Sequence, residues 1–334
     1  MLKTKIIVNL KAKNGKAERN WERFRSKLSI PYEEHTTLYP GHARELAEEF
    51  AAEAQELAED VLIVAFGGDG TVHEVIDGIG ESGYVRVGAV PSGTGNDFAR
   101  GFTLFRKPSD LEKYVYNPTG DAWMDLGRFS SATGQYMFVN SAGIGLDAFI
   151  AHKVNQSNLK KTFNRFYLGQ LTYSFFLFHC LFKFRRFKLT VQTESDTMTF
   201  ENVWLATVSN QPYFGGGMKI SPNSEPDDGQ VELTVIHRLS VFKLLMMFGS
   251  VFIGTHTKMK EVVQISGKSF CLQVDDVIHR HADGEYAGMT IPYQETRFEV
   301  KPARWKLANC KKETGLSHLS VDGEERLEKM ERGS

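Results

Sequence analysis

The stretch Val61-Leu62-Ile63-Val64-Ala65-Phe66-Gly67-Gly68-Asp69-Gly70-Thr71 decides the fold prediction, because a short apolar run passes directly into a glycine-rich loop. The apolar run is typical of a buried strand, and residues 72–76 after the loop have the pattern of an opening helix. Glycines let backbone N–H groups approach phosphate oxygens, and a helix N-terminus adds positive potential. This first glycine loop, residues 67–71, is therefore predicted to cradle phosphate.

A second glycine loop has the sequence Pro91-Ser92-Gly93-Thr94-Gly95-Asn96-Asp97. It also follows an apolar run and precedes a helical pattern, and it carries a hydroxyl, an amide and a carboxylate. The first loop alone is only moderately specific, since glycine clusters also form ordinary turns. Two such loops at neighbouring strand ends would converge on one ligand at the carboxyl edge of a parallel sheet. The pair predicts a nucleotide-triphosphate site.

Strand-like and helical segments alternate through the first third of the chain. This alternation predicts a Rossmann-like α/β domain with a parallel sheet over residues 1–122. The predicted strands cover residues 5–10, 32–37, 61–66 and 85–90, and the predicted helices cover 16–28 and 43–57 and begin again at 72.

Beyond residue 122 the sequence pattern changes to short β-prone segments separated by Gly, Pro, Asn and Asp. This pattern predicts an all-β-rich C-terminal sandwich domain over residues 123–307, with helical inserts at 148–184 and 241–257. The segment 308–334 is charged and short of large apolar groups, which predicts a mobile tail. The predicted strands of the second domain are 136–140, 188–193, 203–210, 231–236, 262–266, 270–274 and 297–302.

The bulk composition of the 334 residues excludes several classes of protein. A net charge of −1 provides no global field for nucleic acid, so no nucleic-acid partner is expected. The three cysteines have no CxxC spacing, which argues against zinc and redox chemistry and favours reduced thiols in the cytoplasm. The N-terminal apolar stretch is too short for a signal peptide, and polar residues interrupt the apolar segment 167–187, so no membrane span is predicted.

Further motifs accompany the two loops in a fixed order. They are Asn9 with Gly15, Asp125-Leu126-Gly127, residues 140–147, Gly215-Gly216-Gly217, Pro222 with Asp227-Asp228-Gly229, and Asp283-Gly284-Glu285. With them the chain resembles the diacylglycerol kinase catalytic family, which also includes sphingosine and ceramide kinases and bacterial lipid kinases. The resemblance runs from residue 6 to about 306, and it departs from the family at Leu10, where proline is usual. It implies a phosphofructokinase-like or NAD-kinase-like nucleotide domain.

The resemblance implies transfer of a phosphoryl group from ATP, with Mg²⁺, to a primary hydroxyl of a membrane lipid, most simply diacylglycerol. Thr37 enters the nucleotide site only by this analogy. His73 is included, although a lone histidine is more often a cap or a packed core residue. The expected nucleotide-binding residues are Asn9, Lys13, Thr37, Gly67, Gly68, Asp69, Gly70, Thr71, His73, Glu74, Ser92, Gly93, Thr94, Asn96 and Asp97.

Two metal sites are expected. Asp69, Asp97 and Asp125 come from separate motifs at one sheet edge, and carboxylates are ligands that Mg²⁺ accepts directly or through water. Each aspartate alone is more simply a helix cap or a turn residue. A second, structural Mg²⁺ held by Asp228 and by backbone carbonyls of Glu225 and Gln230 is implied by the resemblance, with a plain β-turn as the alternative.

The resemblance also places the catalytic base in Asp283-Gly284-Glu285, since a carboxylate suits removal of the lipid hydroxyl proton. The alternative is an ordinary Asp-Gly hairpin turn. The sequence leaves open whether Asp283 or Glu285 is the base.

The stretch Lys183-Phe184-Arg185-Arg186-Phe187-Lys188 interleaves cations and aromatics. It is either a packed aromatic segment with a solvated charged face or a peripheral contact with an anionic membrane. The sequence does not distinguish a monomer from a homodimer.

Two other functions compete with a lipid kinase. A kinase for a soluble nucleotide such as NAD shares the first loop and a β-domain, but the second loop argues against it. A non-catalytic lipid-binding or regulatory protein could keep the fold, and the intact Asp69, Asp97 and Asp283-Gly284-Glu285 argue against that loss of activity.

Overall fold

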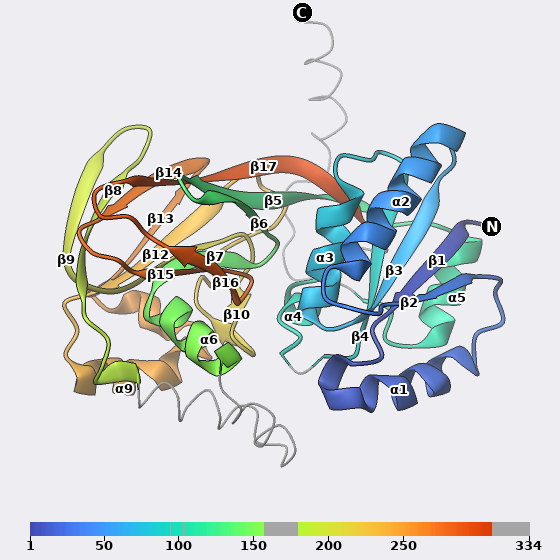
Figure 1. Cartoon of the computed structure of the whole chain (residues 1–334), viewed down its shortest axis with the longest axis horizontal. Helices are drawn as coiled ribbons and strands as arrows, with labels where there is room; N and C mark the ends of the chain where they lie inside the picture. Colours follow the sequence, from blue (N-terminus) through green and yellow to red (C-terminus); the bar gives the residue numbers. More distant parts are fainter. Residues whose placement is uncertain (94, 103, 157–179, 309–334) are drawn as a thin grey trace, which may run out of the picture.

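The computed structural model describes residues 1–93, 95–102, 104–156 and 180–308, which form two domains side by side (Figure 1). Residues 157–179 of the predicted helical insert, the predicted tail from 309 onward, Thr94 and Cys310 lie outside the described residues.

The N-terminal domain is a parallel sheet in the order β2-β1-β3-β4, with helices on both faces. The apolar run of the central strand is buried on both sides, because Ile63 and Ala65 pack with α2 and α3 while Leu62 and Val64 pack with α1 and α5. The predicted parallel α/β domain is therefore confirmed. The elements are β1 (Lys3–Val8), α1 (Lys16–Arg25), β2 (Glu33–Thr36), α2 (His42–Leu57), β3 (Val61–Gly67), α3 (Asp69–Ile79), β4 (Val85–Pro91), α4 (Phe98–Gly101) and α5 (Pro108–Tyr116).

The C-terminal domain is built from antiparallel strands that enclose a second apolar core. The predicted β-sandwich is confirmed, and each strand predicted for this domain overlaps an observed one. Its strands are β6 (Gly134–Phe138), β7 (Ser141–Gly145), β8 (Phe187–Gln192), β9 (Thr197–Ser209), β10 (Tyr213–Phe214), β11 (Met218–Lys219), β12 (Val231–His237), β13 (Val262–Gly267), β14 (Ser269–Val274), β15 (His279–Ala282) and β16 (Glu285–Met289). The helices α6 (Leu146–Gln156) and α9 (Val241–Val251) pack at one end of this domain, on a third core cluster (Figure 1).

Two long strands join the domains (Figure 1). β5 (Ala122–Ser131) pairs along β17 (Glu295–Leu307), and the end of β17 pairs in parallel with β4 of the first sheet. Trp305 of β17 packs against Phe98, which begins α4, and against Phe102, which directly follows α4. The last residues of the predicted β-domain thus belong to the nucleotide-domain sheet. In the described parts of the chain, no helix combines the length and the apolar character needed to cross a membrane.

Helices α2 and α3 approach each other closely at Gly78, where a Cβ would lie 2.2 Å from the carbonyl oxygen of Arg44. Gly78→Ala should therefore lower the free energy of unfolding by about 1–3 kcal/mol through overpacking. The matched control is Gly249→Ala in α9, where a Cβ meets no atom within 4 Å and the change should stabilise by up to about 1 kcal/mol. Urea denaturation measures both; equal stabilisation by the two variants would contradict the close approach.

Candidate active site

The two glycine loops pack against each other backbone to backbone. A Cβ on Gly93 would lie 2.5 Å from Cα of Gly68, so only glycine allows this approach. Ser92 N–H donates to the carbonyl of Gly67 at 2.7 Å. The loops lie at the carboxyl ends of β3 and β4, so the structure brings them together as predicted.

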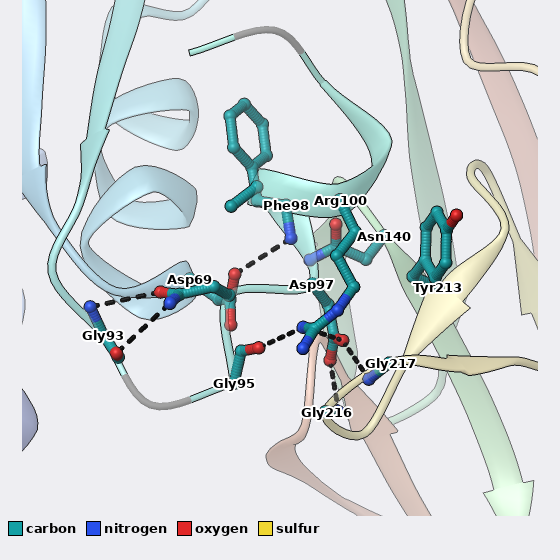
Figure 2. A network of polar contacts seen from close by, with 12 residues as sticks. Asp69, Gly93, Gly95, Asp97, Phe98, Arg100, Asn140, Tyr213, Gly216 and Gly217 are labelled. Carbon is teal, nitrogen blue, oxygen red and sulfur yellow. Dashed lines mark hydrogen bonds and ion pairs between the residues drawn. The ribbon is translucent and has the colours of Figure 1, made fainter. Parts of the chain in front are cut away.

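Asp69 and Asp97 form a carboxylate pair inside this junction (Figure 2). Asp69 begins α3, and its Oδ1 accepts the N–H of Phe98 at 2.9 Å, which also ties the first loop to the second. A Cβ built on Gly95 would lie 3.0 Å from Oδ2 of Asp69 and 3.9 Å from Oδ2 of Asp97. Both oxygens therefore face the same small space beside Gly95.

Burial dominates the electrostatics of this pair. It raises the pKa of Asp69, and burial together with the charge of Asp69 raises the pKa of Asp97 to about 6 in spite of the hydrogen bonds that Asp97 accepts. Two desolvated carboxylates facing one space are a donor set that suits a divalent cation. Within the described residues, no three His, Cys, Asp or Glu side chains gather into a metal site, so an ion here would also need water or phosphate oxygens.

Asp97 also connects the two domains. The backbone N–H groups of Gly216 and Gly217 donate to its two carboxylate oxygens at 2.8 and 2.7 Å, and Arg100 Nη1 lies 3.4 Å from Oδ1 (Figure 2). Arg100 additionally donates to the carbonyl of Gly95. Both glycines have positive φ angles, which aim their amides at Asp97. The contact of Arg100 with Asp97 was not predicted from the sequence. The triple glycine 215–217 was the sequence signal that could have indicated the contact between Asp97 and the C-terminal domain.

Asp125 does not join this pair. Its carboxylate accepts the N–H of Gly229 at 2.6 Å and the N–H of Ala303 at 2.8 Å, and its own N–H donates to the carbonyl of Pro226. Burial raises the pKa of Asp125 to about 6, and the nearby charge of Asp228 adds to the shift. The predicted trio of aspartates is therefore a pair, because β5 carries Asp125 to the turn at residues 225–230.

That turn is the predicted second metal site. Asp228 Oδ1 accepts the N–H of Gln230 at 2.9 Å, and burial raises the pKa of Asp228. Glu225 and Gln230 flank the same turn in the sequence, and the Asp228 carboxylate lies near that of Asp125. The second metal site stays a prediction.

Several predicted nucleotide residues make hydrogen bonds that hold the loops and the neighbouring helices in place. Asn9, just after β1, donates from Nδ2 to Thr71 Oγ1 at 3.0 Å. Ser92 is almost fully buried, and its Oγ accepts from Asn20 of α1 at 3.3 Å. Glu74 accepts the N–H groups of Gly41 and Ala43 at 3.0 and 3.2 Å, so its carboxylate caps the N-terminus of α2.

The other predicted nucleotide residues that the structure describes lie at the same sheet edge. Thr37 follows β2 and donates its N–H to the carbonyl of Val8 at 2.9 Å. Asn96 has a φ of 51°, and its Oδ1 accepts the N–H of Gly93. Gly70 opens α3, Lys13 lies in the 3-10 turn Ala12–Gly15 after β1, and the predicted Thr94 lies outside the described residues.

The acidic turn 283–285 meets helix α3, just after the first loop, through His73. His73 Nδ1–H donates to Asp283 Oδ2 at 2.7 Å, and Asp283 also accepts the N–H groups of Val139, Asn140 and Ser141 at 2.8–2.9 Å. Burial works against the charge of Asp283, but His73 and the backbone donors outweigh it and lower the pKa of Asp283. Glu285, at the start of β16, is exposed.

A buried polar chain runs from this turn to an apolar cavity. His281 Nε2–H donates to Asp147 at 3.0 Å, which leaves Nδ1 to face the N–H of Gly284 at 3.4 Å. Thr207 Oγ1 donates to the same Asp147 oxygen at 2.7 Å, and Phe214 stacks on the His281 ring. Sequence reasoning missed this group, because its members come from four separate strands and helices.

Asp147 and Thr207 are the polar side chains in a cavity that is otherwise apolar among the residues that line it. Its empty volume is about 560 Å³ with its open mouth included. The walls come from α6, α9 and the strands between them, with Ile150, Leu244 and Met247 as examples.

Glycine-rich loops at strand ends that meet an acidic turn across a domain interface are compatible with phosphoryl transfer, which requires donor and acceptor sites to lie close together. Comparisons with known proteins agree. The diacylglycerol kinase catalytic domain model matches residues 3–119, and the YegS C-terminal NAD kinase beta sandwich-like domain model matches residues 140–309.

Individual relatives extend this match over most of the chain. A Bacillus subtilis protein named "Putative lipid kinase YtlR" is 33% identical over 85% of this chain and 94% of its own length. A diacylglycerol kinase of Bacillus subtilis is 30% identical over 76% of this chain and 79% of its own. A solved structure of a diacylglycerol kinase from Bacillus anthracis shares the fold, with a TM-score of 0.64 and 20% identity over 91% of this chain and 96% of that one. The chain belongs to the diacylglycerol kinase family and is a lipid kinase.

His73→Leu should lower the free energy of unfolding by about 1–3 kcal/mol, because it removes one donor from the buried Asp283 carboxylate. Burial lowers the pKa of His73, but Asp283 raises it above its usual 6.5, so the stabilisation is complete below pH 6.5 and is lost as pH rises through the raised pKa. The pKa of Asp283 is lowered, so the stabilisation from its ionised carboxylate is complete above the usual pKa of 3.8. This stabilisation is lost as the pH falls through the lowered pKa.

The difference between wild type and His73→Leu should therefore be largest between about pH 4 and 6.5, by urea denaturation across pH. His73→Gln, which keeps a donor that does not titrate, should recover part of the stability and flatten the alkaline side of the profile. A difference in the free energy of unfolding that grows steadily above pH 7 would contradict the ion pair between His73 and Asp283.

Proposed function

We propose that the protein phosphorylates the primary hydroxyl of diacylglycerol with ATP and releases phosphatidic acid and ADP. The observation that carries the proposal is the bond between His73 and Asp283, which holds the acidic turn of the C-terminal domain against the helix that begins at the first glycine loop. Phosphoryl transfer requires this proximity, since donor and acceptor sites must lie within reach of one another.

In this proposal the backbone of the two glycine loops binds the ATP phosphates, as the N-termini of α3 and α4 favour negative charge. Asp69 and Asp97 would hold Mg²⁺, which supplies charge neutralisation on the phosphates when bound. Arg100 beside Asp97 adds a positive charge at the same edge. Asp125, Asp228 and the turn carbonyls would hold a second, structural ion.

Glu285 is the better candidate for the general base, and Asp283 for a positioning residue. The Asp283 oxygens already accept four hydrogen bonds and its pKa is lowered, which opposes taking a proton. Glu285 lies two residues later and is exposed, so its carboxylate is free to approach a lipid hydroxyl.

The apolar cavity is the proposed site of the lipid chains. Its polar end, Asp147 and Thr207, is linked through His281 to Gly284, the residue next to Glu285. An apolar tail in the cavity would therefore leave the hydroxyl end of the lipid near the turn. The exposed cations of the stretch 183–188 favour peripheral contact with an anionic membrane.

Asp69→Ala should abolish phosphoryl transfer, by at least about 1000-fold, because it removes one of two proposed metal ligands without opening the core. The assay incubates the protein with labelled ATP and Mg²⁺ and with either diacylglycerol vesicles or NAD. Label in phosphatidic acid supports the proposal. Label in NAD, in neither acceptor, or retained turnover by the variant contradicts it.

Glu285→Gln should lower kcat for diacylglycerol about 100-fold or more and leave the thermal midpoint within a degree or two, since the side chain is exposed. Asp283→Asn should instead lower stability clearly, because the amide NH₂ would face backbone donors. Steady-state kinetics and thermal unfolding on both variants separate the two roles. A stable Asp283→Asn protein with lost kcat, beside an active Glu285→Gln protein, would reverse the assignment.

A further inference from the structure

Helix α9 is apolar on two opposite faces. One face, with Leu244, Met247 and Val251, is buried against the cavity and the third core cluster. The other carries Phe242 and Met246, 73% and 69% exposed, and continues to Ile253, 71% exposed just past the helix. An amphipathic surface helix normally turns polar residues outward, so this exposed apolar face calls for a partner.

A second segment next to α9 has the same character. Leu181 packs in the core cluster that contains Leu244 and Met247, and the adjacent Phe182 is 75% exposed. The exposed side chains therefore lie on two segments that contribute residues to the wall of the apolar cavity. We name Phe182, Phe242, Met246 and Ile253 the α9 face.

Basic residues predominate in the two segments that carry the α9 face. Residues 180–188 and 238–260 each contain four lysines or arginines and no acidic residue. Lys243 pairs with Glu261, Lys188 pairs with Glu201, and Arg185 lies 3.7 Å from Asp276, whereas Lys258 and Lys260 form no ion pair with the described residues. The aromatics Phe184 and Phe187 of the basic stretch pack inward, which leaves its cations outside.

We propose that the α9 face inserts into the headgroup region of an anionic bilayer and so brings the wall of the lipid cavity to the membrane. The 11 residues of α9 are too few to cross the hydrocarbon core, so the helix lies in the interface. Apolar side chains ringed by cations match acyl chains below anionic headgroups. A second copy of the same basic face would be repelled. The proposal deepens the proposed function, because it names the route by which the lipid reaches the cavity.

The test compares wild type with the triple variant Phe242→Ser, Met246→Ser and Ile253→Ser in sedimentation with phosphatidylglycerol vesicles. None of the three residues lines the cavity. The partition coefficient should fall at least about tenfold. The control is Tyr116→Ser at the end of α5, 63% exposed in the other domain, which should bind as wild type. Thermal unfolding verifies that each variant is folded.

Charge is tested with Lys258→Gln and Lys260→Gln. This pair should weaken binding to phosphatidylglycerol vesicles and reduce its salt dependence, and phosphatidylcholine vesicles should bind wild type weakly. Equal vesicle binding by wild type and the triple variant overturns the proposal. So does a triple variant that changes only the oligomeric state in gel filtration, since the face would then be an interface between copies.

A catalytic readout separates this inference from the proposed function. The triple variant should lose activity on vesicle-embedded diacylglycerol and keep wild-type activity on a short-chain diacylglycerol dissolved as monomers. If wild type phosphorylates neither lipid but vesicle binding still depends on the α9 face, the proposed function fails and the membrane inference stands. Loss of activity on both lipids in a folded triple variant that binds vesicles normally contradicts the inference.

Discussion

The buried carboxylate of Asp283 is the interaction on which the site depends. Three consecutive backbone N–H groups of residues 139–141 and the ring of His73 satisfy it at 2.7–2.9 Å. Each missing donor would cost about 1–3 kcal/mol, because the ionised carboxylate would keep its burial and lose a hydrogen bond. The requirement therefore fixes the start of β7, the turn before β16 and helix α3 relative to one another.

A second carboxylate fixes the other side of the interface in the same way. Asp97 belongs to the nucleotide domain, and its donors Gly216 and Gly217 belong to the β-domain. The two contacts bring the glycine loops and the acidic turn together from residues more than 100 positions apart in the sequence. Between them, the domains present the two glycine loops on one side and an apolar cavity on the other.

The sequence predicts the α/β domain well, because buried parallel strands are apolar runs and glycines mark their ends. It misses β7 and β15, since a strand of Ser, Ala and Gly and a strand containing two histidines and an arginine carry no apolar alternation. It groups Asp125 with Asp69 and Asp97, because strand ends are visible in the sequence but the turn that reaches Asp125 from residues 225–230 is not. The cavity cannot be predicted from the sequence for the same reason, because its lining comes from segments far apart in the chain.

The central claim is that the contact between His73 and Asp283 positions Glu285 for the reaction. A double-mutant cycle on kcat for diacylglycerol with His73→Gln and Glu285→Gln tests it most directly. The account predicts that each change lowers kcat and that the double variant is no slower than Glu285→Gln alone, since positioning has no effect once the base is gone. Effects that multiply in the double variant would show that the two residues act independently, and would contradict the account.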